Sequence, residues 1–218
     1  MESNWTPIGP FPTIGPIMDR SWWTIEVLPA ETADDPRGRA AAGAIRVLGF
    51  AGPVVRVADL YFIACGTGSF PGIGSGGEAR GRIERAAPAI FADAVTQVFR
   101  IQGPEGPDRA IPEDRAFLSV GRWAHKVTVM KRPGVMDPVE ASAAQALGDL
   151  GIPGAPIRTA CRFYFRDPLP AEARAAIGTK ALSNPAIEEV FWDDAPLSAP
   201  FAPGREYRFS RVEIPLEG

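Results

Sequence analysis

Few residues in this sequence are of the types that carry out enzyme chemistry. His125 is the single histidine, and Cys65 and Cys161 are the two cysteines. Zinc sites of the common His/Cys type need more ligands of this kind, and a Cys–His nucleophile pair could use only His125. We therefore expect no metal site and no catalytic residue, and we interpret both cysteines as reduced, partly buried thiols.

The glycine-rich segment 66–77 is a second chemical candidate. Gly72, Gly74 and Gly77 match the spacing G-x-G-x-x-G. That spacing binds a pyrophosphate when it directly follows a parallel strand and precedes an acidic residue by about 20 positions. Neither feature is evident, so a flexible loop is the main interpretation and a phosphate-binding loop the alternative.

Composition limits the class of protein. The chain has 218 residues, of which 45% are hydrophobic and 22% charged, with a net charge of −3. These values are typical of soluble domains and give no reason to expect a nucleic-acid or membrane partner. We also find no apolar run of membrane-spanning length and no signal-peptide pattern at the N-terminus, so we expect a cytoplasmic protein.

A helix is predicted to begin at Asp137-Pro138. Asp accepts backbone N–H groups at an N-cap, and Pro suits the first helical position. Glu140 completes the pattern of a capping box, and Gly151 suits the position after the last turn. A strand over 157–165, a helix over 171–182 and a strand over 186–192 follow, with a turn at Ser183-Asn184-Pro185.

The first half of the chain repeats this pattern at an offset of 102, which places Asp35-Pro36 on Asp137-Pro138 and Arg56 on Arg158. From Trp23 to Phe62 there are 11 identities in 40 positions without a gap. Beyond Phe62 we align Phe99 with Phe191 at an offset of 92, so that Ala92-Asp93 replaces Asn184-Pro185. The sequence thus predicts an internal duplication with a ten-residue insertion in the first copy.

Five divisions of the chain follow from this repeat. They are an extended N-terminal arm (1–22), a first repeat (23–101) with the glycine-rich insertion (66–77), a linker (102–122), a second repeat (123–193), and a proline-rich connector with a C-terminal strand (194–218).

The second repeat resembles the PurS family, the small subunit of phosphoribosylformylglycinamidine synthase, and the PurS-like N-terminal domain of the large synthase chains. The resemblance covers about one third of the chain and depends on five pieces in the family's order and spacing: 131–138, 150–151, 157–159, 162–165 and 182–188. Cys161 and the aromatic run after Arg162 are closer to the large-chain version.

The resemblance implies an α+β fold of two fused, ferredoxin-related β-α-β-α-β units that form a pseudo-dimer with antiparallel sheets. It also implies a non-catalytic role in purine biosynthesis, in which the chain bridges a PurL-type synthetase and a PurQ-type glutaminase and assists ammonia transfer. The chain would hold no cofactor itself, and ATP, Mg²⁺ and glutamine would belong to the assembled enzyme. It would be either a free subunit or a part of a larger synthase.

Two groups of residues are predicted to matter. The residues that we expect to contact partners are Arg56, Arg158, Arg162, Arg166 and Asn184, and those that we expect to hold turns and helix starts are Asp35, Pro36, Asp137, Pro138 and Pro185. On the middle strand of the second copy, alternation puts Arg162, Tyr164 and Arg166 on one face, which we expect to meet solvent or a partner. The matching face of the first copy is apolar, and we expect it to be buried.

A function of another class stays open. Tandem α+β units also form small-molecule sensors, and segment 66–77 with Arg162 and Arg166 could then bind a nucleotide or another anion.

Overall fold

The computed structural model describes residues 22–30, 33–66, 72–104 and 123–193, together with residues 195 and 197. These residues form an α+β fold with one open six-stranded antiparallel sheet and four α-helices. No helix in the described ranges is long and apolar enough to cross a membrane. The predicted arm (1–22), most of the linker, and the C-terminal strand lie outside the described residues, apart from Trp22 and linker residues 102–104.

Both halves contain the same order of elements. The first half, residues 22–104, consists of β1 (Trp22–Pro29), α1 (Pro36–Val47), β2 (Val55–Ala64), α2 (Gly77–Ala86), the π-helical turn η1 (Ala87–Phe91) and β3 (Gln97–Gln102). The second half, residues 123–193, consists of β4 (His125–Lys131), α4 (Pro138–Asp149), β5 (Ile157–Phe165), α5 (Ala171–Ile177), the π-helical turn η2 (Gly178–Leu182) and β6 (Glu188–Trp192). The strand–helix–strand–helix–strand order predicted for each half is confirmed.

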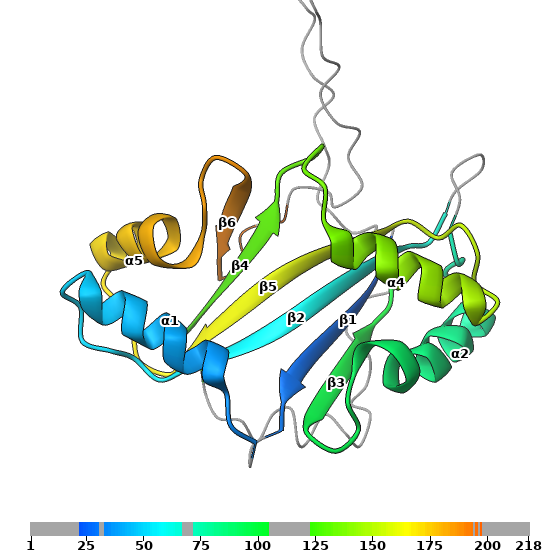
Figure 1. The fold of residues 1–218 in the computed structure, drawn as a ribbon, viewed down its shortest axis with the longest axis horizontal. Helices are drawn as coiled ribbons and strands as arrows, with labels where there is room; N and C mark the ends of the chain where they lie inside the picture. Colours follow the sequence, from blue (N-terminus) through cyan, green and yellow to red (C-terminus); the bar gives the residue numbers. More distant parts are fainter. Residues whose placement is uncertain are drawn as a thin grey trace, which may run out of the picture.

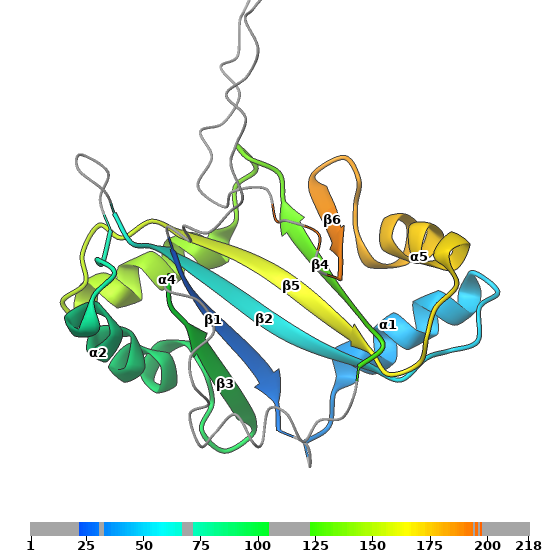
Figure 2. The same ribbon diagram turned by 180° about the vertical axis from the view of Figure 1, so that it is seen from behind.

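The sheet joins the two halves through its central strands. Its order is β3-β1-β2-β5-β4-β6, so β2 pairs with β5, and each half supplies three adjacent strands (Figures 1 and 2). In this pairing Asp59 lies opposite Cys161. These two residues are 102 positions apart, which is the repeat offset. The centre of the sheet therefore falls between two equivalent residues of the halves.

The helices lie on one face of the sheet in two pairs, and each pair mixes the halves. Figures 1 and 2 show α1 beside α5 at one end and α4 beside α2 at the other. Accordingly, Ile45 of α1 belongs to the buried cluster of Ile177 and Phe165, and Leu147 of α4 belongs to that of Ile25 and Ile83. Each half therefore completes the apolar core of the other.

The ends of helix α4 lie where the sequence predicts them. Asp137 accepts the Val139 N–H at 3.0 Å, Pro138 is the first helical residue, and Gly151 has a φ of 80°. The predicted capping box is wrong, because the Glu140 carboxylate accepts the Thr159 N–H of β5 at 3.1 Å instead of turning back to the cap. Tertiary contact thus outcompetes the local motif.

The alignment of the last strands needs a correction of one residue. Val98 pairs with Leu28 and Glu189 with Met130, so equivalent positions of β3 and β6 differ by 91. Phe99 packs against the helix-side core, whereas Phe191 packs with Leu60 and Phe62 on the other face. The insertion is therefore eleven residues long, and the pairing of the two phenylalanines is wrong because a one-residue shift reverses every side chain.

The corrected offset places Asn184 on Asp93. Both side chains accept the N–H two residues on, Val95 at 2.7 Å and Ala186 at 3.1 Å. Both residues also donate their own N–H to the side chain four residues on, Gln97 or Glu188. The same side-chain turn thus precedes the last strand of each half.

Candidate functional site

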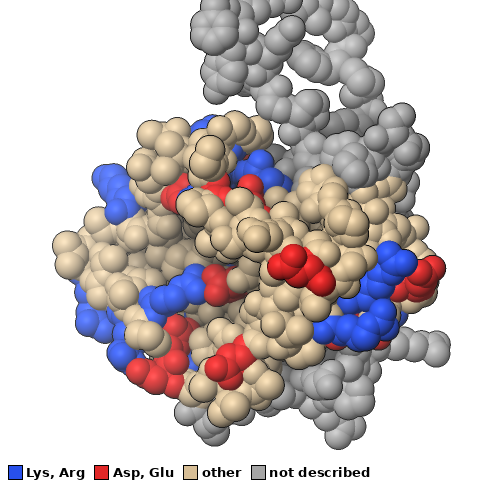
Figure 3. All heavy atoms as spheres, turned by 45° about the vertical axis from the view of Figure 1, so that its right-hand side comes forward, with Lys and Arg blue, Asp and Glu red and all other residues tan. Residues whose placement is uncertain are grey.

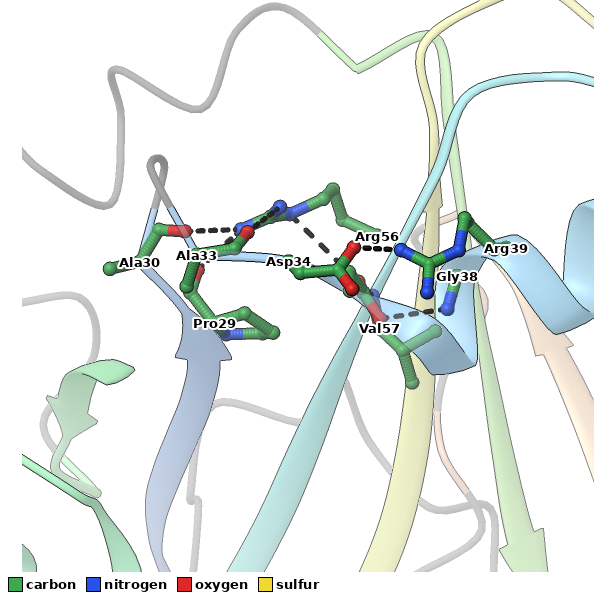
Figure 4. Close-up of polar contacts among 9 residues, drawn as sticks. Pro29, Ala30, Ala33, Asp34, Gly38, Arg39, Arg56 and Val57 are labelled. Carbon is green, nitrogen blue, oxygen red and sulfur yellow. Dashed lines mark hydrogen bonds and ion pairs between the residues drawn. The ribbon is translucent and has the colours of Figure 1, made fainter. Parts of the chain in front are cut away.

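The start of helix α1 is fixed to the sheet by one buried carboxylate. Asp35 accepts the Gly38 N–H at 2.7 Å and the Val57 N–H of β2 at 2.8 Å. Arg56 lies 3.9 Å from this carboxylate and donates to the carbonyls of Pro29 and Ala30 at 2.6 and 2.7 Å. Figure 4 shows this arginine directed into the turn after β1. Arg56 therefore stabilises the turn after β1, and this structural role requires no contact with a partner protein.

The start of helix α4 is likewise fixed to the sheet, but by different side chains. Arg158, the counterpart of Arg56, donates to the Lys131 carbonyl at 2.9 Å, as Arg56 does to Pro29. Glu140 accepts the Thr159 N–H and the Arg158 Nε, and Asp137 accepts the Thr159 hydroxyl at 2.8 Å. The role of Asp35 is therefore divided between two carboxylates in the second half.

Gly38 explains why one carboxylate suffices in the first half. A Cβ at this position would lie 2.2 Å from the Val55 carbonyl oxygen and 3.0 Å from the Asp35 carboxylate carbon. Glycine therefore allows α1 to approach β2 closely enough for Asp35 to bond the strand directly.

The centre of the helix-side face holds a three-residue contact. Arg37 of α1 donates to both oxygens of Asp59, at 2.8 and 2.7 Å, and to Cys161 Sγ at 3.0 Å. Burial raises the pKa of the Cys161 thiol to about 11, despite the nearby Arg37 charge. At neutral pH this cysteine is a thiol rather than a thiolate, so it is a poor nucleophile.

Two hollows flank this centre, and their linings correspond by the repeat. The first hollow has a volume of about 200 Å³ and the second about 340 Å³. Corresponding positions that line them are Pro29, Asp35, Arg37, Val57, Asp59 and Gln97 in the first hollow, and Lys131, Asp137, Val139, Thr159, Cys161 and Glu188 in the second.

The two hollows differ in what stands at their rims. Arg37 extends from the rim of the first hollow to Asp59, whereas its counterpart Val139 is short and half exposed. Asp34, which bonds Arg39 (Figure 4), lines the first hollow, whereas its counterpart Met136 is 86% exposed and does not line the second. The second hollow therefore has the larger volume, has Val139 in place of Arg37 at its rim, and contains no arginine of its own half in its lining.

Arg162 lies on the opposite face of the sheet, in a buried group that we call the Glu26 cluster: Glu26, Arg100, Arg162 and Tyr164. Arg162 donates to Glu26 Oε1 at 3.1 Å and to the Thr128 hydroxyl at 2.9 Å, and Arg100 and Tyr164 also bond the Glu26 carboxylate. Tyr164 is buried, and the Arg162 side chain is 15% exposed. The expectation that these two residues face solvent is wrong.

The charges of this cluster depend on one another. Burial alone would raise the pKa of Glu26, but the charges of Arg162 and Arg100 and the Tyr164 hydrogen bond outweigh it and hold that pKa below its ordinary value. Burial and the Glu26 charge raise the pKa of the Tyr164 hydroxyl. Glu26 is thus ionised and Tyr164 neutral near pH 7.

The remaining predicted residues are more exposed. Arg166 is exposed and lies over the Trp123 ring, 5.7 Å from its centroid. Asn184 is exposed and forms the turn before β6, where Arg132 donates to the Pro185 carbonyl at 3.2 Å. The structure does not bring the five predicted contact residues together.

His125 has a partner that sequence reasoning missed. Its Nδ1 lies 3.2 Å from the Asp193 carboxylate, which also accepts from Arg174 at 3.1 Å. The pairing of β4 with β6 brings these residues together, and no local signal in the sequence predicts it. Asp193 also accepts the Lys126 N–H at 3.1 Å, so this carboxylate joins the start of β4 to the end of β6.

The glycine-rich segment does not have the setting of a dinucleotide loop. The strand before it, β2, is antiparallel to both of its neighbours. Gly74 has a φ of 92°, and its carbonyl accepts the Trp23 indole N–H at 2.8 Å. Residues 67–71 lie outside the described residues.

Within the described ranges, no group of three or more His, Cys, Asp or Glu residues is placed to hold a metal ion. In comparisons with known proteins, no family model and no curated protein matches the chain.

Proposed function

We propose that the chain is a PurS-like, non-catalytic component of phosphoribosylformylglycinamidine synthase, which bridges the synthetase and the glutaminase in the cytoplasm and assists ammonia transfer. The observation that carries the proposal is the central pairing of β2 with β5, in which the equivalent residues Asp59 and Cys161 lie opposite each other. Two fused units related as subunits of a dimer would pair in this way.

This proposal includes a finer description of the fold. Each half is a ferredoxin-related β-α-β-α-β unit, and the halves form a pseudo-dimer that exchanges its first helices. The shared helix pairs and the repeated Arg56 and Arg158 contacts support that reading. Because each half completes the core of the other, a separated half is not expected to fold alone.

A structural role agrees with the chemistry of the candidate residues. Arg56, Arg158 and Arg162 all bond groups of their own chain, and Cys161 is a neutral thiol. The partners would instead meet exposed residues such as Arg166 and Asn184. ATP, Mg²⁺ and glutamine would bind the synthetase and glutaminase.

The face in Figure 3 bears on how partners would be recognised. Acidic and basic side chains are interspersed over its described part, without a broad area of one sign. Such a surface favours specific pairs over long-range steering by a single charge sign.

Reconstitution tests the proposal. Product formation is followed with the synthetase and glutaminase from the same source, with glutamine or free ammonia, and with or without the chain. We expect glutamine-driven turnover to require the chain and ammonia-driven turnover to require it much less. Unchanged rates together with no complex in gel filtration would reject the coupling role.

The second hollow favours one other function, a small-molecule sensor. Its volume of about 340 Å³ lies within the range of small-ligand pockets, about 300–1,000 Å³. A sensor would gain thermal stability from its ligand without any protein partner. A panel of purine nucleotides and small organic cations, tested by thermal unfolding of the chain alone, separates this function from the coupling role.

A further inference from the structure

The second hollow has a lining that selects for charge. Asp59, Asp137 and Glu188 contribute carboxylates to it, and Lys131 contributes one ammonium group. Arg37 neutralises Asp59 at 2.7 Å, and Lys131 lies 3.7 Å from Asp137. Glu188 forms no ion pair with any residue in the described ranges, and its carboxylate accepts only the Asn184 N–H in the recorded bonds. The lining therefore retains one uncompensated negative charge.

The first hollow shows what kind of group occupies this setting. There, an alkyl guanidinium, the Arg37 side chain, passes inward from the rim and ends on the central Asp59 and Cys161. The same central pair borders the second hollow, where Val139 leaves the equivalent path open. Gln97, the counterpart of Glu188, carries no charge. The first hollow thus has the Arg37 guanidinium where the second has Val139, and the second has the Glu188 carboxylate where the first has Gln97.

We propose that the second hollow binds a small organic cation, a guanidinium or primary ammonium group on an aliphatic stem. The charged end would lie between Glu188 and Asp137, with the Thr159 hydroxyl and Tyr61 beside it, and the stem would lie against Val139. The inference concerns the hollow itself and depends on neither proposed function.

Agmatine, an alkyl guanidine with a terminal amine, is a suitable probe. Succinate, a shorter molecule of opposite charge, is its control. Titration of the full ¹⁵N-labelled chain, followed by two-dimensional NMR, should show saturable shifts for the amides of Thr159, Cys161 and Glu188 with agmatine only. No saturable shift at millimolar agmatine, or equal shifts with succinate, would overturn the proposal.

Three substitutions locate the site. Val139→Trp covers the hollow from a half-exposed position and should abolish agmatine binding, whereas Val47→Trp, at an exposed position of α1, should leave it unchanged. Glu188→Gln installs the residue type of the first half and should weaken binding about tenfold. Glu189→Gln, one residue along the same strand, is the matched control for loss of charge.

A substitution outside the lining of the second hollow should strengthen agmatine binding rather than weaken it. Arg37→Leu leaves the Asp59 carboxylate without its cation and should tighten agmatine binding, because the negative charge at the hollow rises by one. Circular dichroism verifies that each variant is folded. If agmatine binds equally well to the wild type, Val139→Trp and Glu188→Gln, the cation lies elsewhere and the assignment is wrong.

Discussion

The face of the sheet away from the helices contains two clusters at equivalent places, and they are built from opposite chemistry. On one side lies the Glu26 cluster, and on the other lies an apolar group that we call the Phe62 cluster: Leu60, Phe62, Met130 and Phe191. The repeat offsets pair Glu26 with Thr128, Arg162 with Leu60, Tyr164 with Phe62, and Arg100 with Phe191. The same backbone arrangement therefore accommodates a network of charged side chains in one place and a cluster of apolar side chains in the other.

This difference indicates what each cluster contributes. A buried ion pair is weak evidence for stability, because desolvation offsets most of the attraction, while loss of one partner leaves an unpaired charge. The Phe62 cluster has no such dependence. We therefore expect the Glu26 cluster to be the more fragile of the two under single substitutions, although its total contribution to stability is not larger.

The largest expected effect comes from breaking the network at its centre. Glu26→Ala removes the only carboxylate of the cluster and leaves the largely buried Arg162 and the partly buried Arg100 without it, which should lower the free energy of unfolding by about 3–5 kcal/mol. Urea denaturation measures this change. The change at the equivalent position, Thr128→Val, removes only the hydroxyl that accepts from Arg162 and should cost less than about 1.5 kcal/mol, and equal losses would contradict the comparison.

Replacing the whole network should reverse most of that loss. The variant Glu26→Thr, Arg100→Phe, Arg162→Leu and Tyr164→Phe copies the Phe62 cluster onto the other side. Because well-packed apolar residues often match or exceed a buried ion network by about 1–4 kcal/mol, this variant should be at least as stable as the wild type. A variant less stable than Glu26→Ala would show that the two places are not equivalent.

Low pH should lower the stability of the wild type more than that of the fourfold variant. The folded-state pKa of Glu26 lies below its ordinary value, so its contribution to stability is fully present above the unfolded pKa of about 4.3 and is lost as pH falls through the folded pKa. The free energy of unfolding of the wild type should fall more steeply below about pH 4.3 than that of the fourfold variant. Parallel curves would mean that Glu26 does not carry this dependence.

The sequence predicted the elements whose signals are local. Asp137-Pro138 and Gly151 fix the ends of α4 because capping uses backbone groups within one turn. The offset of 102 also placed Arg56 and Arg158 correctly as counterparts. Both contacts lie at the end of a strand beside a helix start.

The predictions that are wrong concern residues whose contacts are set by strands distant in the sequence. The sequence alignment places Phe99 on Phe191, whereas the pairing of the strands sets the register one residue away. Glu26 was not selected at all, since its partners come from β3 and β5. Glu140 was assigned to a local box, although β5 offered it the Thr159 N–H. Such choices depend on tertiary neighbours that a single sequence does not display.

The next prediction concerns the closeness of α1 to β2. Gly38→Ala places a Cβ against the Val55 carbonyl and should lower the free energy of unfolding by about 2–3 kcal/mol through overpacking. Gly43→Ala in the same helix meets nothing within 4 Å and should instead stabilise the chain by about 0.5–1 kcal/mol. Equal effects of the two substitutions would show that helix propensity, rather than the close approach, governs Gly38.

The smallest expected effect compares the two helix starts. Asp35→Ala leaves two backbone N–H groups, those of Gly38 and Val57, without their acceptor and should cost about 2 kcal/mol, the upper end for a cap. Asp137→Ala should cost only about 1 kcal/mol, because Glu140 still holds the Thr159 N–H. Adding Glu140→Ala to Asp137→Ala should then raise the loss to that of Asp35→Ala or beyond. If Asp137→Ala alone is as damaging as Asp35→Ala, the division of this role between two carboxylates is wrong.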